Sequence, residues 1–123
     1  METYSGRIGK FWEKLDAAVG RVSADLLNIR RFYEGCCSAE DVSAKKRFVG
    51  EIDAIIKEGA GIFGYLENLI AEAVTIGLEQ KAANNLEKMI KGLKMQHELY
   101  MQQYGALCRQ IAIAEMAEVS RTL

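Results

Sequence analysis

The sequence has no proline, one histidine and only three cysteines among its 123 residues. Because proline breaks helix interiors, its absence permits long uninterrupted helices. Cys36 and Cys37 are adjacent, where a mutual disulfide would be strained, so we expect reduced thiols and a cytoplasmic location. The first ten residues lack the apolar core of a secretory signal. No uncharged apolar run reaches the roughly eighteen residues of a membrane-spanning helix.

Neither sign of charge predominates. The chain carries 16 basic and 17 acidic residues, for a net charge of -1. No global field therefore attracts nucleic acid or anionic lipid. Lys88, Lys91 and Lys94 recur every three residues without interleaved exposed aromatics, which is typical of a solvated helix face. We expect no nucleic-acid partner.

The scarcity of histidine and cysteine also limits the available chemistry. A di-iron bundle needs two Glu-x-x-His motifs, and one histidine cannot supply them. A structural zinc site would need all four Cys and His residues, two of them adjacent. A cysteine nucleophile needs a nearby base, and Cys108 lies about three helical turns from His97. We therefore predict no metal, no cofactor and no enzymatic activity.

What the sequence does contain is heptad periodicity. Apolar residues alternate in steps of four and three along three separate stretches, as they do on the packed face of a helix. The first row is Ile8, Trp12, Leu15, Val19, Val22, Leu26, Ile29 and Tyr33, widened by Phe11, Ala18 and Phe32. The last row is Leu86, Ile90, Leu93, His97, Tyr100, Tyr104, Leu107, Ile111 and Ala114.

The central stretch, from Val42 to Gly77, has two such rows and so predicts a helix with at least two neighbours. One row is Val49, Ile52, Ile56, Gly59, Phe63, Leu66, Ile70 and Ala73. The other is Phe48, Ile55, Ile62, Leu69 and Ile76. Three glycines between Gly59 and Gly64 disfavour helix, yet both rows cross them in phase. We favour a continuous or locally bent helix, with a break as the alternative.

Two connections are indicated between these helices. Gly35 occupies a C-cap position, and Ser38 with Asp41 approximates a capping box for the central helix. A second break is expected over 81–85, with Asn84 and Glu87 as its capping pair. The prediction is a single all-α domain over residues 1–123. It is an antiparallel bundle of three long helices, or four if the central helix breaks at Gly59 to Gly64.

His97, Tyr100 and Tyr104 gather on one face of the last helix. They form either a polar layer that fixes helix register or a small ligand pocket with a possible acid or base. The segment 59–78 is glycine-rich and apolar, but Glu67 and Glu72 limit it to an interfacial membrane contact at most. We expect no membrane partner.

Unbroken heptad rows without catalytic groups favour a non-enzymatic protein-protein interaction module that works as a homo- or hetero-oligomer. We predict a partner-binding surface at large aromatic and apolar residues near helix ends and bends. These residues are Phe11, Trp12, Phe63, Leu66 and Ile70. Alternatives are a ligand-binding or catalytic bundle using His97, Tyr100 and Tyr104, and an interfacial membrane binder.

The architecture resembles, as a class, three groups of helical proteins: small chaperones of bacterial secretion systems, helical subunits of nucleoprotein or viral assemblies, and spectrin-like repeats. The resemblance implies an adaptor, an assembly subunit or a secretion-type chaperone. No motif of these groups is present, so no functional residue is transferred.

Overall fold

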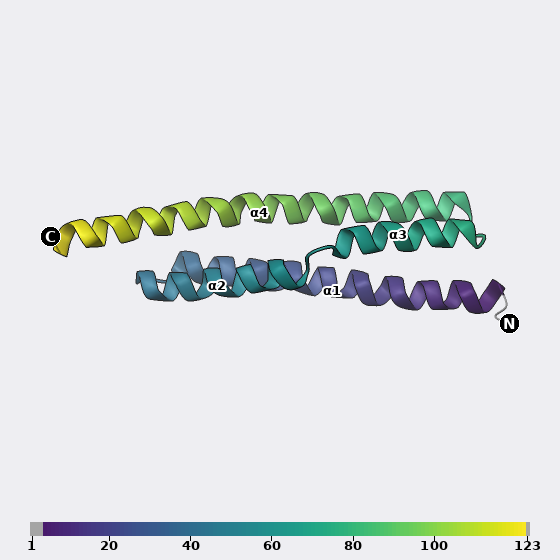
Figure 1. The fold of residues 1–123 in the computed structure, drawn as a ribbon, viewed down its shortest axis with the longest axis horizontal. Helices are drawn as coiled ribbons and strands as arrows, with labels where there is room; N and C mark the ends of the chain where they lie inside the picture. Colours follow the sequence, from purple (N-terminus) through teal and green to yellow (C-terminus); the bar gives the residue numbers. More distant parts are fainter. Residues whose placement is uncertain (1–3, 123) are drawn as a thin grey trace. The chain divides into compact units, whose positions relative to one another are not determined.

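The computed structural model describes residues 4–122, which form four helices connected by short turns (Figure 1). The helices are α1 (Tyr4–Ser38), α2 (Val42–Glu58), α3 (Ile62–Thr75) and α4 (Gln80–Thr122). No strand occurs among the described residues. The predicted all-α helical bundle is confirmed.

The glycine-rich segment interrupts the helical hydrogen bonding between α2 and α3. Gly61 has φ 83°, in the left-handed region, and directly precedes the first residue of α3. The Ile62 amide donates to the Gly59 carbonyl at 3.2 Å, which closes a tight turn. If each run of unbroken helical hydrogen bonds is counted as a helix, the chain has four helices. If α2 and α3 are counted as one helix bent at this turn, it has three, as the heptad rows predict.

The first connection differs from the prediction. α1 continues past Gly35 to Ser38, so Gly35 is not its C-cap. A Cβ atom on Gly35 would lie 2.8 Å from Cε1 of Phe48, so this glycine allows α1 to approach α2 closely. Asp41, rather than Ser38, caps α2, because its Oδ1 accepts the Ala44 amide at 2.7 Å.

The second connection comes earlier than predicted. α3 ends with paired bonds from Leu78 N to Ala73 O at 2.8 Å and from Gly77 N to Val74 O at 3.1 Å. This is the Schellman pattern of a helix C-terminus. Asn84 lies inside α4, where its Oδ1 accepts Gln80 Nε2 at 2.9 Å, and so does not cap that helix.

The chain divides into two compact units. Unit 1 contains residues 4–24 and 59–96 of the described chain, and unit 2 contains 25–58 and 97–122. α1 and α4 supply residues to both units.

The core of unit 1 is aliphatic except for Phe11. Its buried side chains are Phe11, Leu15, Ala18 and Val22 of α1, Leu66, Leu69, Ile70 and Ala73 of α3, and Ala83 and Ile90 of α4. Phe11 is only 4% exposed, whereas the next residue, Trp12, is 37% exposed. Phe11 and Ala18, which the sequence places beside the predicted row, are therefore buried in place of Trp12 and Val19, whereas Leu15 and Val22 of that row are buried as predicted.

Unit 2 has a separate core. Ile29 and Cys36 of α1, Ile52 of α2, and Leu107 and Ile111 of α4 form one buried cluster. Half-buried aromatic residues surround it, among them Phe32, Tyr33, Phe48, Tyr100 and Tyr104. On the surface of this unit, Lys46 of α2 forms an ion pair with Glu115 of α4.

Candidate functional site

The predicted partner-binding residues all lie in unit 1. Phe11, Leu66 and Ile70 are buried at 4%, 0% and 2% exposure, Phe63 is half-buried, and Trp12 is exposed. A partner could therefore reach Trp12 and part of Phe63 without opening the unit. Leu66 and Ile70 also show that the apolar face of the segment 59–78 is directed into the core.

His97, Tyr100 and Tyr104 are all half-buried on α4 in unit 2. The Tyr104 hydroxyl donates to Oδ1 of Asp53 on α2 at 3.3 Å. The other oxygen of this carboxylate pairs with Lys57 Nζ at 2.8 Å. Tyr104 thus belongs to a polar contact that joins α4 to α2.

The electrostatics of this contact favour a structural role. The hydrogen bond from Lys57 lowers the pKa of Asp53, and that from Tyr104 adds to the effect. The pKa of Tyr104 is raised to about 12, mainly by burial and next by a hydrogen bond with Cys108. At neutral pH the phenol therefore stays protonated and acts as a donor, so its deprotonated form is not available to act as a general base.

The cysteines are unpaired and differ in exposure. Cys36 is fully buried, Cys37 is exposed and Cys108 is intermediate. Burial raises the pKa of the Cys36 thiol, which keeps it in its less reactive form. Among the described residues, no three His, Cys, Asp or Glu side chains gather as metal ligands would.

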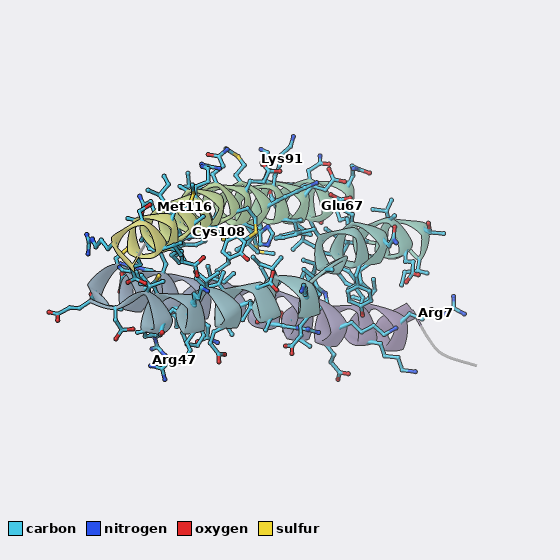
Figure 2. All side chains as sticks on the ribbon, turned by 60° about the vertical axis from the view of Figure 1, so that its left-hand side comes forward. Arg7, Arg47, Glu67, Lys91, Cys108 and Met116 are labelled. Atoms are coloured by element: carbon cyan, nitrogen blue, oxygen red, sulfur yellow. The ribbon has the colours of Figure 1, made fainter. Side chains whose placement is uncertain are left out.

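The most exposed apolar row in unit 2 lies at the end of α4. Ile113, Met116 and Val119 are 67%, 70% and 57% exposed, and we call these three residues the C-terminal face. Figure 1 shows the last turns of α4 continuing past the end of α1 and the start of α2, and Figure 2 labels Met116 near the C-terminal end of α4. Within unit 2, neither α1 nor α2 covers the C-terminal face.

The local packing explains why this face turns outward. Ile111 is 7% exposed in the core of unit 2, and residues two apart on a helix point to nearly opposite sides. Ile113 must therefore face solvent once Ile111 is buried. The ion pair between Glu115 and Lys46 shows that the side of α4 that carries Glu115 faces α2. The heptad row ending at Ala114 does not include the C-terminal face, but the apolar spacing of 113, 116 and 119 could have indicated it.

Comparison with protein-family models, curated proteins and solved structures finds no match for this chain. Within residues 4–122, no helix is both long enough and apolar enough to cross a membrane.

Proposed function

We propose that this protein is a non-enzymatic assembly subunit that self-associates through the C-terminal face of α4. The observation that supports the proposal is the exposure of Ile113, Met116 and Val119 at 67%, 70% and 57% in one row of a single helix. Apolar rows with i, i+3 spacing are the surfaces that helices bury against other helices.

A second copy of the same chain is the occupant we favour. In a two-fold symmetric pair both subunits use the same patch, so the patch must be complementary to itself in shape and charge. The residues around the C-terminal face include Arg109 and Arg121 as well as Glu115 and Glu118, which gives no excess of either sign. The net charge of -1 for the whole chain also keeps repulsion between copies small.

The polar contact between Tyr104 and Asp53 supports a non-enzymatic role, because the Asp53 carboxylate is already engaged by the Tyr104 hydroxyl and by Lys57 within unit 2. A cytoplasmic location belongs to the same proposal and is supported by the three free thiols. Cell fractionation with an antibody against the chain would test the location.

The experiment is the absolute mass in solution, measured by size-exclusion chromatography with light scattering over a dilution series. We expect an oligomer that dissociates on dilution, and we expect Met116→Lys to convert it to a monomer. Met95→Lys is the matched control, because Met95 is on the same helix and 67% exposed but lies outside the C-terminal face.

Circular dichroism should show the same helical content for both variants and the wild type. A wild-type chain that stays monomeric at every concentration would overturn self-association. Equal effects of the two lysine substitutions would overturn the assignment to the C-terminal face.

A further inference from the structure

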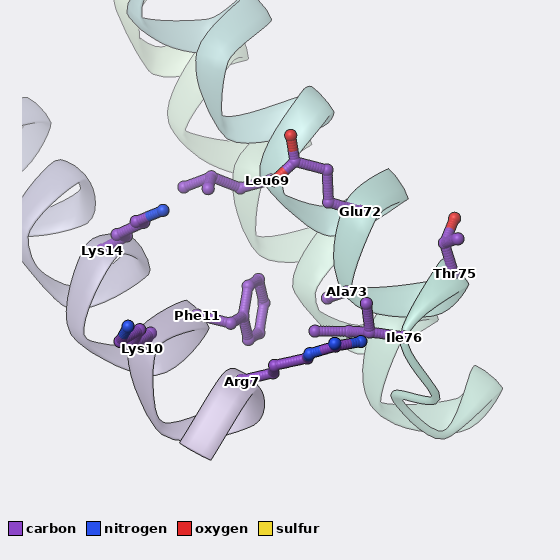
Figure 3. A pocket seen from close by; sticks show the side chains of 9 residues that line it. All are labelled: Arg7, Lys10, Phe11, Lys14, Leu69, Glu72, Ala73, Thr75 and Ile76. Atoms are coloured by element: carbon purple, nitrogen blue, oxygen red, sulfur yellow. The ribbon is translucent and has the colours of Figure 1, made fainter. Parts of the chain in front are cut away.

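Unit 1 contains a groove between α1 and α3 with a volume of about 390 Å³ (Figure 3). Its base is apolar and is formed by Phe11, Leu69, Ala73 and Ile76. The first three of these are at most 4% exposed. Figure 3 shows the Phe11 ring directed from α1 toward α3. The volume falls within the range of about 300–1,000 Å³ that is usual for small-molecule pockets.

The rim of this groove is positively charged. Arg7, Lys10 and Lys14 follow one another at spacings of three and four residues, which places them on one side of α1. Glu72 on α3 is the one carboxylate among the groove's lining residues. The lining therefore carries a formal charge of +2, although the whole chain carries -1.

An apolar base with a cationic rim is complementary to a molecule that has an apolar body and an anionic head. We propose that the groove binds one single-chain anionic amphiphile as a soluble monomer. The alkyl chain lies along Ile76, which is half-buried, and the edge of Phe11, and the head group lies at the cationic rim formed by Arg7, Lys10 and Lys14. The cationic side chains can keep their charged ends in water while they contact the head group.

The groove suits other ligand classes less well. A nucleotide would need stacking surfaces and base-specific donors, whereas the base here is aliphatic except for one buried phenylalanine. A peptide helix would need a longer apolar track than one groove of this volume offers.

Decanoate and decylammonium are the probes for the test, because they share one alkyl chain and differ in the sign of the head group. Both are used below the concentrations at which they form micelles, and binding is measured by isothermal titration calorimetry. The sole tryptophan, Trp12, gives a second signal, since the centroid of its ring lies 5.2 Å from the ring centroid of Phe11. We expect one decanoate per chain, with a change in tryptophan fluorescence and weaker binding of decylammonium.

Two substitutions should shift the affinity for decanoate in opposite directions. Lys14→Gln removes a positive charge from the rim and should weaken binding about two- to fivefold. Glu72→Gln removes the opposing carboxylate and should tighten binding by a similar factor of about two to five. Arg47→Gln is the matched control, because Arg47 is an exposed cation in unit 2 and should leave the affinity unchanged.

The proposal is overturned if decanoate does not bind, if decylammonium binds equally well, or if Lys14→Gln and Glu72→Gln leave the affinity unaltered. Binding to anionic phospholipid vesicles without binding to monomeric decanoate would also overturn it and would indicate a membrane surface instead. Met116→Lys, which tests self-association, should leave decanoate binding intact, so the two proposals fail independently.

Discussion

Gly35 of α1 lies against the ring of Phe48 of α2, so closely that a Cβ atom at position 35 would be 2.8 Å from Cε1 and 2.9 Å from Cζ. The Phe48 ring is itself packed against Phe32, with ring centroids 6.3 Å apart. A glycine inside a helix costs stability, and here the cost is offset by close packing of α1 on α2 in unit 2.

Gly35→Ala should lower the free energy of unfolding by about 1–3 kcal/mol, because the added methyl group overlaps the Phe48 ring. Gly50→Ala is the control, since outside the adjacent backbone of its own helix no atom lies within 4 Å of the added methyl group, and it should raise stability by about 0.5–1 kcal/mol. Urea denaturation followed by circular dichroism measures both. In a Phe48→Leu background the penalty at position 35 should shrink, and an undiminished penalty would contradict the contact.

Gly61→Ala should destabilise the turn between α2 and α3 by about 1–2 kcal/mol, because φ 83° is costly for a residue with a Cβ atom. Gly61→Asn should cost less, since asparagine tolerates the left-handed region better than alanine does. Gly64→Ala should be stabilising, because Gly64 has a helical backbone and there is open space around the added methyl group. Thermal unfolding ranks the three variants, and equal effects at positions 61 and 64 would exclude the conformational explanation.

Tyr104 should make the protein sensitive to alkali. Its pKa is raised from 10.0 to about 12 in the folded state, so folding favours the protonated phenol. The resulting stabilisation is complete below pH 10 and is lost as the pH rises toward 12. In Tyr104→Phe, stability should therefore fall less steeply across this interval.

Denaturant unfolding at several pH values between 10 and 12 measures this difference. Tyr65→Phe is the control, because Tyr65 is 45% exposed and lies in unit 1. If Tyr104→Phe loses stability in alkali as steeply as the wild type does, the phenol is not the responsible group.

Iodoacetamide should modify the two adjacent cysteines at very different rates. Cys37 is exposed, whereas Cys36 is fully buried and its pKa is raised by that burial. The thiolate is the reactive form, so Cys36 should react only when unit 2 opens. Tandem mass spectrometry over a time course separates the two sites, and mild urea should accelerate labelling of Cys36 selectively. Similar rates for both thiols without denaturant would contradict the described packing.

The sequence alone determined that the chain folds as helices. Steps of three and four along Leu15, Val22, Leu26 and Ile29 recur with the period of a helix, and all four side chains are buried. The last row was also predictable, because every residue from Leu86 to Ala114 in it is buried or half-buried. Periodicity is a local property of the backbone, which is why it can be read without knowing the neighbours.

Tertiary structure decided which of two adjacent apolar residues faces inward. Phe11 and Trp12 both continue the pattern, yet Phe11 is buried and Trp12 is exposed, because the position of α3 and not the spacing selects the side of α1 that is covered. The groove beside Phe11 follows from the same choice. Likewise, the spacing of Ile111 and Ile113 requires that they face opposite ways, but only the packing in unit 2 decides that Ile113 remains uncovered. The sequence alone determined the period of the helices, whereas contacts between distant residues decided which side of each helix is buried, because burial depends on neighbours that the local pattern does not specify.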